Sequence, residues 1–176
     1  MKGTMTKTRK GANLERFAAR ACGLGAKAAK VIRASTISAA PWVRLKCRYG
    51  CDGYGSSLCC PPHTPTPDEM RAILASYRRA VLFEARRGRS KRIAAALERE
   101  IFLDGFHKAF GLGAGPCDLC DRCRLELPCL HPDDARPSME ACGIDVYGTA
   151  RRNGFTIEVV RSRRDRQHYF GMVLID

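Results

Sequence analysis

Long hydrophobic runs are absent from this sequence of 176 residues. No stretch approaches the roughly 20 apolar residues that a membrane-spanning helix needs. The basic start, Met1 to Gly11, is not followed by an apolar run of signal-peptide length. We therefore expect a cytoplasmic protein without membrane contact, with a flexible basic N-terminus at 1–12 and a cysteine-rich metal-binding domain at 13–176.

Acidic residues are scarce, with 18 Asp and Glu against 31 Lys and Arg and a formal net charge of +13. Such a balance favours polyanionic partners, either nucleic acid or an acidic protein surface, without choosing between them. Part of the charge has a different explanation if the chain holds metal. Two four-iron clusters held by thiolates would each carry about two negative charges, which would lower the net charge to roughly +9.

The sequence also lacks a catalytic triad, a phosphate-binding loop, an internal repeat and a long linker. It does contain ten cysteines, and only Cys22 stands apart from the others. In a reducing compartment, clustered cysteines indicate metal or redox chemistry rather than a disulfide framework.

Hydrophobic periodicity and turn residues predict an α+β fold, a single compact domain with a mainly antiparallel sheet and flanking helices. Helices are expected at 13–22, 68–77, 90–103 and 137–149. Strands or short extended segments are expected at 27–32, 42–45, 80–83, 106–112, 155–160 and 169–175, with 161–167 as a hairpin turn. In the helix at 90–103, Lys91 is expected on the polar face.

The second cysteine group, 117–142, begins with Cys117, Cys120 and Cys123 within seven residues. Two-residue gaps let a loop present successive sulfurs to one centre, as in the ferredoxin run that binds a 4Fe-4S cluster. Zinc ribbons usually have two separated Cys-x-x-Cys pairs. The spacing therefore favours an iron-sulfur cluster over zinc.

Cys129 and Cys142 are the further candidates in this group. Cys129 comes after a longer gap than in ferredoxins and follows a proline instead of preceding one. Cys142 falls on an apolar helical face with Met139 and Val146, where a buried apolar cysteine is the alternative. In two-cluster ferredoxins the fourth cysteine of one run serves the other cluster, and either residue could do so here.

The first cysteine loop, 47–62, holds Cys47, Cys51 and the pair Cys59-Cys60 around several glycines. Because adjacent side chains diverge, we expect only one cysteine of the pair to bind, and Cys60 is preferred since its Cys-Pro step resembles a ferredoxin ligand. The fourth position is open to Cys129, Cys142, Cys59, His63 or an exogenous group. A structural zinc site is the alternative for this loop.

Short motifs from Gly25 onward carry a family resemblance. They are Val43-Arg-Leu-Lys-Cys47, Gly50-Cys51, Tyr54-Gly55, Cys60-Pro-Pro62, Pro65-Thr-Pro67, Gly113-Ala-Gly-Pro-Cys117, Cys120, Cys123, Arg136-Pro-Ser-Met-Glu-Ala-Cys142-Gly-Ile-Asp145 and Tyr169-Phe-Gly171. In these motifs the sequence resembles an uncharacterised prokaryotic family of predicted metal-binding proteins, domain-of-unknown-function family 2284. The resemblance implies metal binding through these cysteines in a soluble protein, without an established reaction. It also implies that Cys59 is a local substitution.

Three functions compete at this point. The first is an iron-sulfur electron carrier or redox accessory, with one or two 4Fe-4S clusters and a partner protein that has an acidic docking surface. The second is a reductase with an under-ligated cluster, in which Glu140, Asp145 or His131 handles protons, although such carboxylates are commonly helix caps or ion-pair partners. The third is a zinc-stabilised nucleic-acid or protein interaction module that uses the basic runs 86–92 and 161–166.

Overall fold

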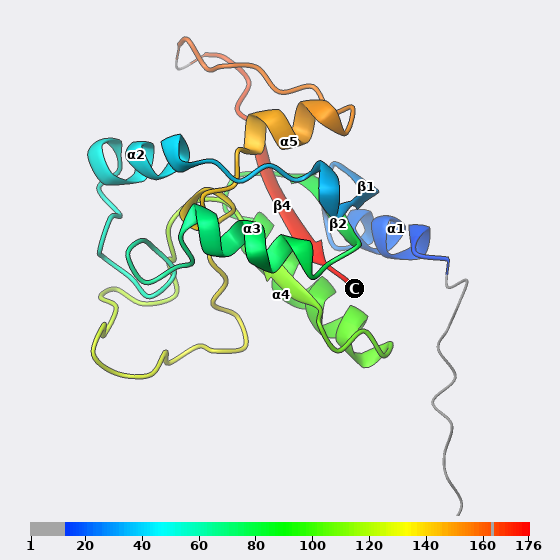
Figure 1. The fold of residues 1–176 in the computed structure, drawn as a ribbon, viewed down its shortest axis with the longest axis horizontal. Helices are drawn as coiled ribbons and strands as arrows, with labels where there is room; N and C mark the ends of the chain where they lie inside the picture. The colour runs from blue at the N-terminus through cyan, green and yellow to red at the C-terminus, as the bar shows by residue number, and fades with distance from the viewer. Residues whose placement is uncertain (1–12, 163) are drawn as a thin grey trace, which may run out of the picture.

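A computed structural model describes residues 13–162 and 164–176 (Figure 1), and the basic segment predicted at 1–12 lies outside this part. Its helices are α1 (Glu15–Gly23), α2 (Pro41–Gly50), α3 (Pro67–Ala75), α4 (Ser90–Leu103) and α5 (Val146–Arg152), with short 3-10 helices η1 (Ala34–Thr36) and η2 (Glu140–Cys142). Its strands are β1 (Ala28–Arg33), β2 (Arg79–Ala85), β3 (Phe110–Leu112) and β4 (Tyr169–Leu174). Among the described helices, none is both long enough and apolar enough to cross a membrane.

The strands form one antiparallel sheet in the order β1-β2-β4-β3. At its centre, Val81 of β2 pairs with Val31 of β1 on one side and with Val173 of β4 on the other. In both β2 and β4 every residue after the first is buried. Their nearly continuous apolar sequence is what a strand covered on both faces requires.

Helices cover both faces of this sheet. On one face Val81 and Phe83 pack with the apolar sides of α1 and α4. On the other face Leu82 and Met172 join a core with residues of α3, α5 and η2. Because successive side chains of a strand point to opposite faces, one apolar run supplies both cores. The predicted α+β fold with flanking helices is confirmed.

Several predicted elements need correction. Segment 42–45, predicted as extended, lies in α2, whose first turn contains Pro41 with a fixed φ that suits a helix start. The helix predicted at 137–149 is divided into η2 and α5, because Gly143 turns the chain with φ +77°. Within the described chain, segment 155–160 forms no strand, so 161–167 does not close a hairpin, and the strand at 106–112 shortens to β3.

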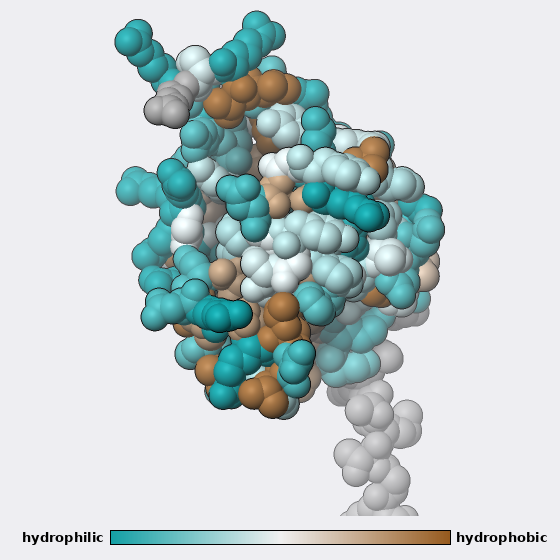
Figure 2. Space-filling view, turned by 90° about the vertical axis from the view of Figure 1, so that its left-hand side faces the viewer, coloured by the Kyte–Doolittle hydropathy of each residue, from teal (hydrophilic) through white to brown (hydrophobic). Residues whose placement is uncertain are grey.

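Both cysteine-rich segments lie at one end of the molecule, on the left of Figure 1. The connection from α2 to α3 carries the first loop, and the connection from β3 to η2 carries the second group. They touch, since a Cβ built on Gly53 would lie 3.5 Å from Cβ of Pro116. The surface on this side is largely hydrophilic, with separate hydrophobic spots (Figure 2).

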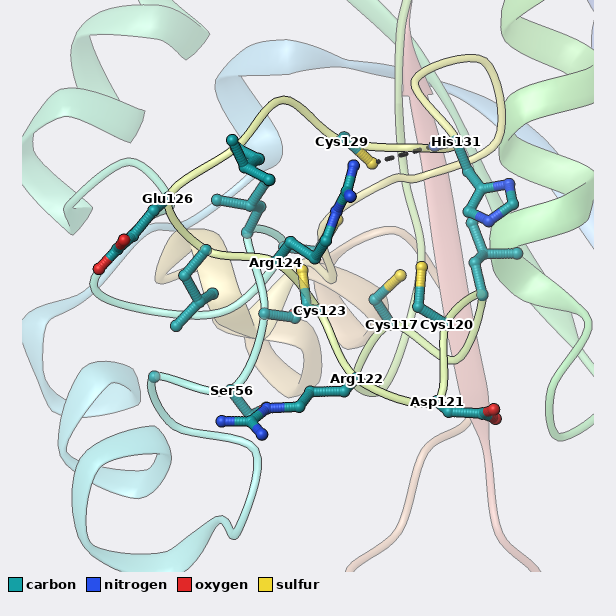
Figure 3. A pocket seen from close by; sticks show the side chains of 17 residues that line it. Ser56, Cys117, Cys120, Asp121, Arg122, Cys123, Arg124, Glu126, Cys129 and His131 are labelled. Atoms are coloured by element: carbon teal, nitrogen blue, oxygen red, sulfur yellow. Dashed lines mark hydrogen bonds between the residues drawn. The ribbon is translucent and has the colours of Figure 1, made fainter.

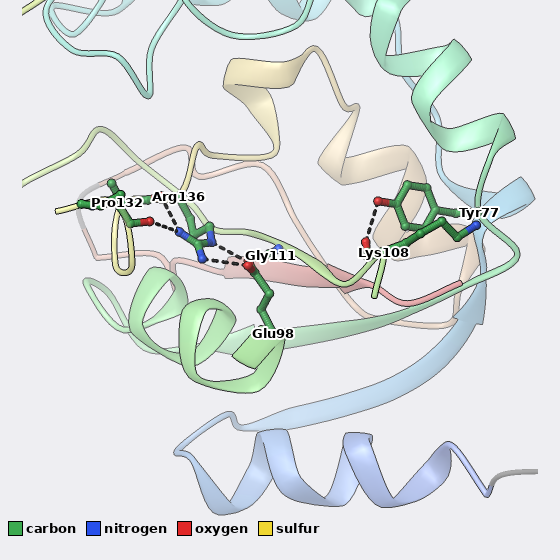
Figure 4. Close-up of polar contacts among 7 residues, drawn as sticks. Tyr77, Glu98, Lys108, Gly111, Pro132 and Arg136 are labelled. Atoms are coloured by element: carbon green, nitrogen blue, oxygen red, sulfur yellow. Dashed lines mark hydrogen bonds and ion pairs between the residues drawn. The ribbon is translucent and has the colours of Figure 1, made fainter. Parts of the chain in front are cut away.

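A partly buried ion pair anchors the returning end of the second connection (Figure 4). The Arg136 guanidinium donates to Glu98 on α4, with Nε to Oε2 at 2.5 Å and Nη2 to Oε1 at 2.8 Å. Glu98 Oε2 also accepts the Gly111 N–H of β3 at 2.7 Å, and Arg136 donates to the carbonyl of Pro132 at 3.0 Å. The side chains are only 11% and 15% exposed. The Glu98 carboxylate therefore links α4, β3 and the end of the second connection.

Replacing Glu98 tests this anchor. Glu98→Ala leaves the partly buried Arg136 without its carboxylate, so we expect the free energy of unfolding to fall by about 2–4 kcal/mol. The control is Glu100→Ala, which removes the exposed pair with Arg20 on the same helix and should cost about 1 kcal/mol or less. Urea unfolding of the metal-free protein measures both, and equal losses would contradict the anchor.

Candidate metal centres

All ten cysteines are free thiols. Cys22 is exposed on α1, on the opposite side of Figure 1 from the cysteine loops. The remaining cysteines lie on or near the walls of two neighbouring pockets, which divide them into a first and a second group.

Cys47, Cys51 and Cys60 line the first pocket, of about 550 Å³. Cys47 lies in the last turn of α2, and Cys51 directly follows the helix with an extended backbone. Cys60 arrives from the loop. Burial raises the pKa of Cys47, and the neighbouring Cys51 thiol adds to the rise. The structure thus brings together the three cysteines that the sequence predicts for this loop.

Gly53 keeps the space between two of these sulfurs open. A Cβ built there would lie 3.5 Å from Cys51 Sγ and 3.8 Å from Cys60 Sγ. The Gly53 N–H also donates to Cys51 Sγ at 3.4 Å, and donors of this kind tune a metal held by thiolates. The space is a cradle that a side chain would fill.

The remaining wall of the first pocket is mostly apolar, with rings from Trp42, Tyr54, Tyr147, Tyr169 and Phe170. Glu140 lines the same pocket, and its Oε2 atom is enclosed without a hydrogen-bond partner in the described chain. Burial raises the pKa of this carboxyl group. An apolar pocket with a few polar groups is typical of a small-molecule site.

Cys142 lies behind the first pocket and not in its wall. Its thiol is buried in the core with Met139 and Ile144, and burial raises its pKa to about 12. The thiols of Cys59 and Cys47 are near enough to add to that rise. The burial agrees with the apolar alternative that the sequence leaves open, and ligation by Cys142 stays a prediction.

Cys117, Cys120, Cys123 and Cys129 line the second pocket, of about 850 Å³ (Figure 3). The thiols of Cys117 and Cys120 point in the same direction, toward the segment that carries Cys129. The backbone N–H of His131 donates to Cys129 Sγ at 3.4 Å. Partial burial raises the pKa of Cys120, and the sulfurs of Cys123 and Cys117 raise it further.

Cys59 also lines the second pocket. Its neighbour Cys60 lines the first, so the adjacent side chains diverge as expected but face different groups. Burial raises the pKa of the Cys59 thiol to about 12, and the sulfur of Cys117 adds to the rise. The sequence offers Cys59 as a candidate fourth ligand of the first loop, and the family resemblance implies a local substitution, whereas the structure places this residue on the wall of the second pocket.

Lys91 is a residue of this region that the sequence does not single out. Predicted on the polar face of α4, it has an enclosed Nζ atom with no hydrogen-bond partner among the described residues. Burial lowers its pKa, while the thiols of Cys117 and Cys59 raise it. An unpaired cation beside these thiols fits a bound anionic group, and thiolates suit iron-sulfur clusters or zinc.

The remaining candidates lie in different settings. Asp145 caps α5, where its carboxylate accepts the Gly148 N–H at 2.9 Å, as the helix-cap alternative predicts. His131 lines the second pocket, and His63 is exposed and lines neither pocket. Within the described ranges, no three His, Cys, Asp or Glu side chains are close enough to hold a single metal ion.

Filling the Gly53 cradle should weaken metal binding without unfolding the chain. In Gly53→Ala the new methyl group makes ordinary contacts with its neighbours, so the stability of the metal-free protein should change by less than about 0.5 kcal/mol. Metal retention by the first group should fall by about tenfold, a typical effect of changes around a metal site. Gly50→Ala, which meets no atom within 4 Å in the described chain, is the matched control. Unchanged transfer of metal to a chelator in Gly53→Ala would refute the cradle.

The metal-free protein should lose stability in alkaline solution. Folding raises the pKa of Cys142 to about 12 from about 8.5 in an unfolded chain. This stabilisation is fully present below about pH 8.5 and falls as the pH rises toward the folded value, since the unfolded state releases the proton first. Unfolding in urea between about pH 8 and 10 should show a shallower decline for Cys142→Ala than for Cys22→Ala. Equal slopes in the two variants would contradict this assignment.

Comparison with known proteins agrees with the donor chemistry. A family model described as predicted metal-binding protein (DUF2284) matches residues 30–175, which include both cysteine groups. The sequence matches no curated protein and no solved structure with which it was compared. Since the match covers most of the chain, this protein belongs to the predicted metal-binding protein family DUF2284.

Proposed function

We propose that this protein carries one or two 4Fe-4S clusters and acts in electron transfer or as a redox accessory to a client enzyme. The observation that carries the proposal is that sulfurs of both groups line the walls of two neighbouring pockets. Cys117, Cys120, Cys123 and Cys129 would hold one cluster, and Cys47, Cys51 and Cys60 the other, with Cys142 as a candidate for its fourth ligand.

The size of the two pockets, about 550 and 850 Å³, supports iron-sulfur over zinc. A zinc ion bound by four thiolates at about 2.3 Å requires sulfurs roughly 3.8 Å apart around one point. A 4Fe-4S cluster offers a separate iron to each sulfur, so its ligands stay on the walls of a wider space. The three-cysteine run with two-residue gaps supports the same choice.

When bound, such a cluster supplies reversible transfer of single electrons. The chain would contribute N–H donors to the sulfurs, from Gly53 to Cys51 and from His131 to Cys129. Cys59 lines the second pocket, and the next residue, Cys60, lines the first. This adjacency supports two centres that work together.

The exposed face of α2 supports a docking site beside the first group. Trp42, Leu45 and Tyr49 are 47%, 58% and 77% exposed, and their spacing places them on one side of the helix. Lys46 and Arg48 add positive charge. We propose that a redox partner with an acidic surface docks here, steered by these charges.

A cluster-dependent reductase is the second candidate. It is favoured by the first pocket, where three cysteines, aromatic rings and Glu140, whose Oε2 atom has no hydrogen-bond partner among the described residues, surround space for a small molecule. Turnover of a small substrate with an artificial reductant would favour this candidate over a pure electron carrier.

Metal and acid-labile sulfide analysis of anaerobically purified protein tests the proposal. Two 4Fe-4S clusters correspond to about eight iron and eight sulfide per chain, and their broad visible absorption bleaches on reduction. Replacing Cys117, Cys120 and Cys123 together by Ser should halve both contents, whereas Cys22→Ser should change neither. Stoichiometric zinc without sulfide would refute the redox proposal and favour the zinc-stabilised interaction module.

A further inference from the structure

Lys91 brings a positive charge into the interior beside the cysteines. The residue lies in the first turn of α4, yet its Nζ atom is enclosed and donates to no acceptor among the described residues. The adjacent Arg92 is exposed. A buried ammonium without an acceptor destabilises a folded protein, so the position of Lys91 favours a negatively charged group bound beside it.

Gly113 allows the Lys91 side chain to take this route. A Cβ built on Gly113 would lie 2.4 Å from Cγ of Lys91 and 3.1 Å from its Cα. The glycine cannot retreat easily, because its N–H donates to the carbonyl of Pro137 and its carbonyl accepts the N–H of Met139, both at 2.9 Å. Glycine is thus required here for the space it leaves to the lysine.

Lys91 lies close to the cysteines, since it lines one cavity with Pro116 and Asp118, the residues on either side of Cys117. Cys117 and Cys59 belong to the second pocket wall and Cys60 to the first, and all three thiols act on the lysine charge. Two carboxyl groups, Asp118 and Glu140, also act on it. Neither carboxyl group forms an ion pair with Nζ in the described chain. Lys91 is therefore positioned to respond to charge on either group of sulfurs.

We propose that Lys91 is an internal counter-cation for metal-bound thiolates, shared by the two cysteine groups and positioned by Gly113. The proposal rests on metal binding as proposed above. Its ligand class is a thiolate-metal group with net negative charge, such as a 4Fe-4S cluster with four cysteine ligands. Lys91 is a positioning residue, since it stabilises the bound group through charge and is not itself a metal ligand.

This role predicts effects of opposite sign in the two states of the protein. In the metal-free state, Lys91→Met removes an unpaired buried charge, so the urea midpoint of unfolding should rise. In the loaded state the same change removes a compensating charge, so transfer of metal to a chelator should become about tenfold faster. The reduction potential should become more negative, because an added electron is less stabilised without the cation.

Two further variants separate this role from a purely structural one. Arg92→Met makes the same change of charge one residue away on the exposed side of α4, and should alter none of these quantities. Gly113→Ala keeps the lysine but displaces its stem, and should reproduce the faster metal loss. A lower urea midpoint for metal-free Lys91→Met, or unchanged metal retention and potential, would overturn the proposal. If the wild type binds no metal, both proposals fail, whereas metal binding equal to wild type in Lys91→Met refutes only the role of Lys91.

Discussion

Burial of β2 and β4 on both faces is the constraint on which the rest of the structure depends. A strand without a polar face needs cover on both sides, and α1 with α4 supplies one cover while α3, α5 and η2 supply the other. The faces of the sheet are thus occupied by packing. The cysteines lie instead at one end of the molecule, where the two connections that carry them extend beyond the packed layers and touch.

Those connections are long, yet they are tied to the scaffold close to their sulfurs. Gly113 bridges to Ser138 at the base of the second connection, and Arg136 holds the same segment to Glu98 of α4. Lys91 also belongs to α4. The helix that packs on the sheet therefore fixes both the end of the second connection and the position of the positive charge near the cysteines. Local rigidity of this kind suits a site whose donors must keep their positions when metal is exchanged.

The sequence predicts the fold better than it predicts the site. The pattern predicts segments such as α4 and β4 correctly, since burial alone determines their periodicity. The helix α2 was missed because its exposed apolar residues resemble a short strand, and segment 155–160 because Phe155 and Ile157 are buried without strand pairing. Cysteine spacing predicts which cysteines of one segment lie close together. It cannot show that Cys59 lines the second pocket, because that position depends on how the two loops pack against each other.

The net charge of +13 misleads if it is applied to the whole surface. The exposed side of α2, beside the first group, carries basic residues, whereas segment 117–135, around the second group, has five acidic and two basic side chains. Screening limits the reach of surface charges to about 10 Å at moderate salt, so a partner responds to the local charge. The two cysteine groups thus lie in surroundings of opposite charge, and the chain's overall basicity describes neither of them.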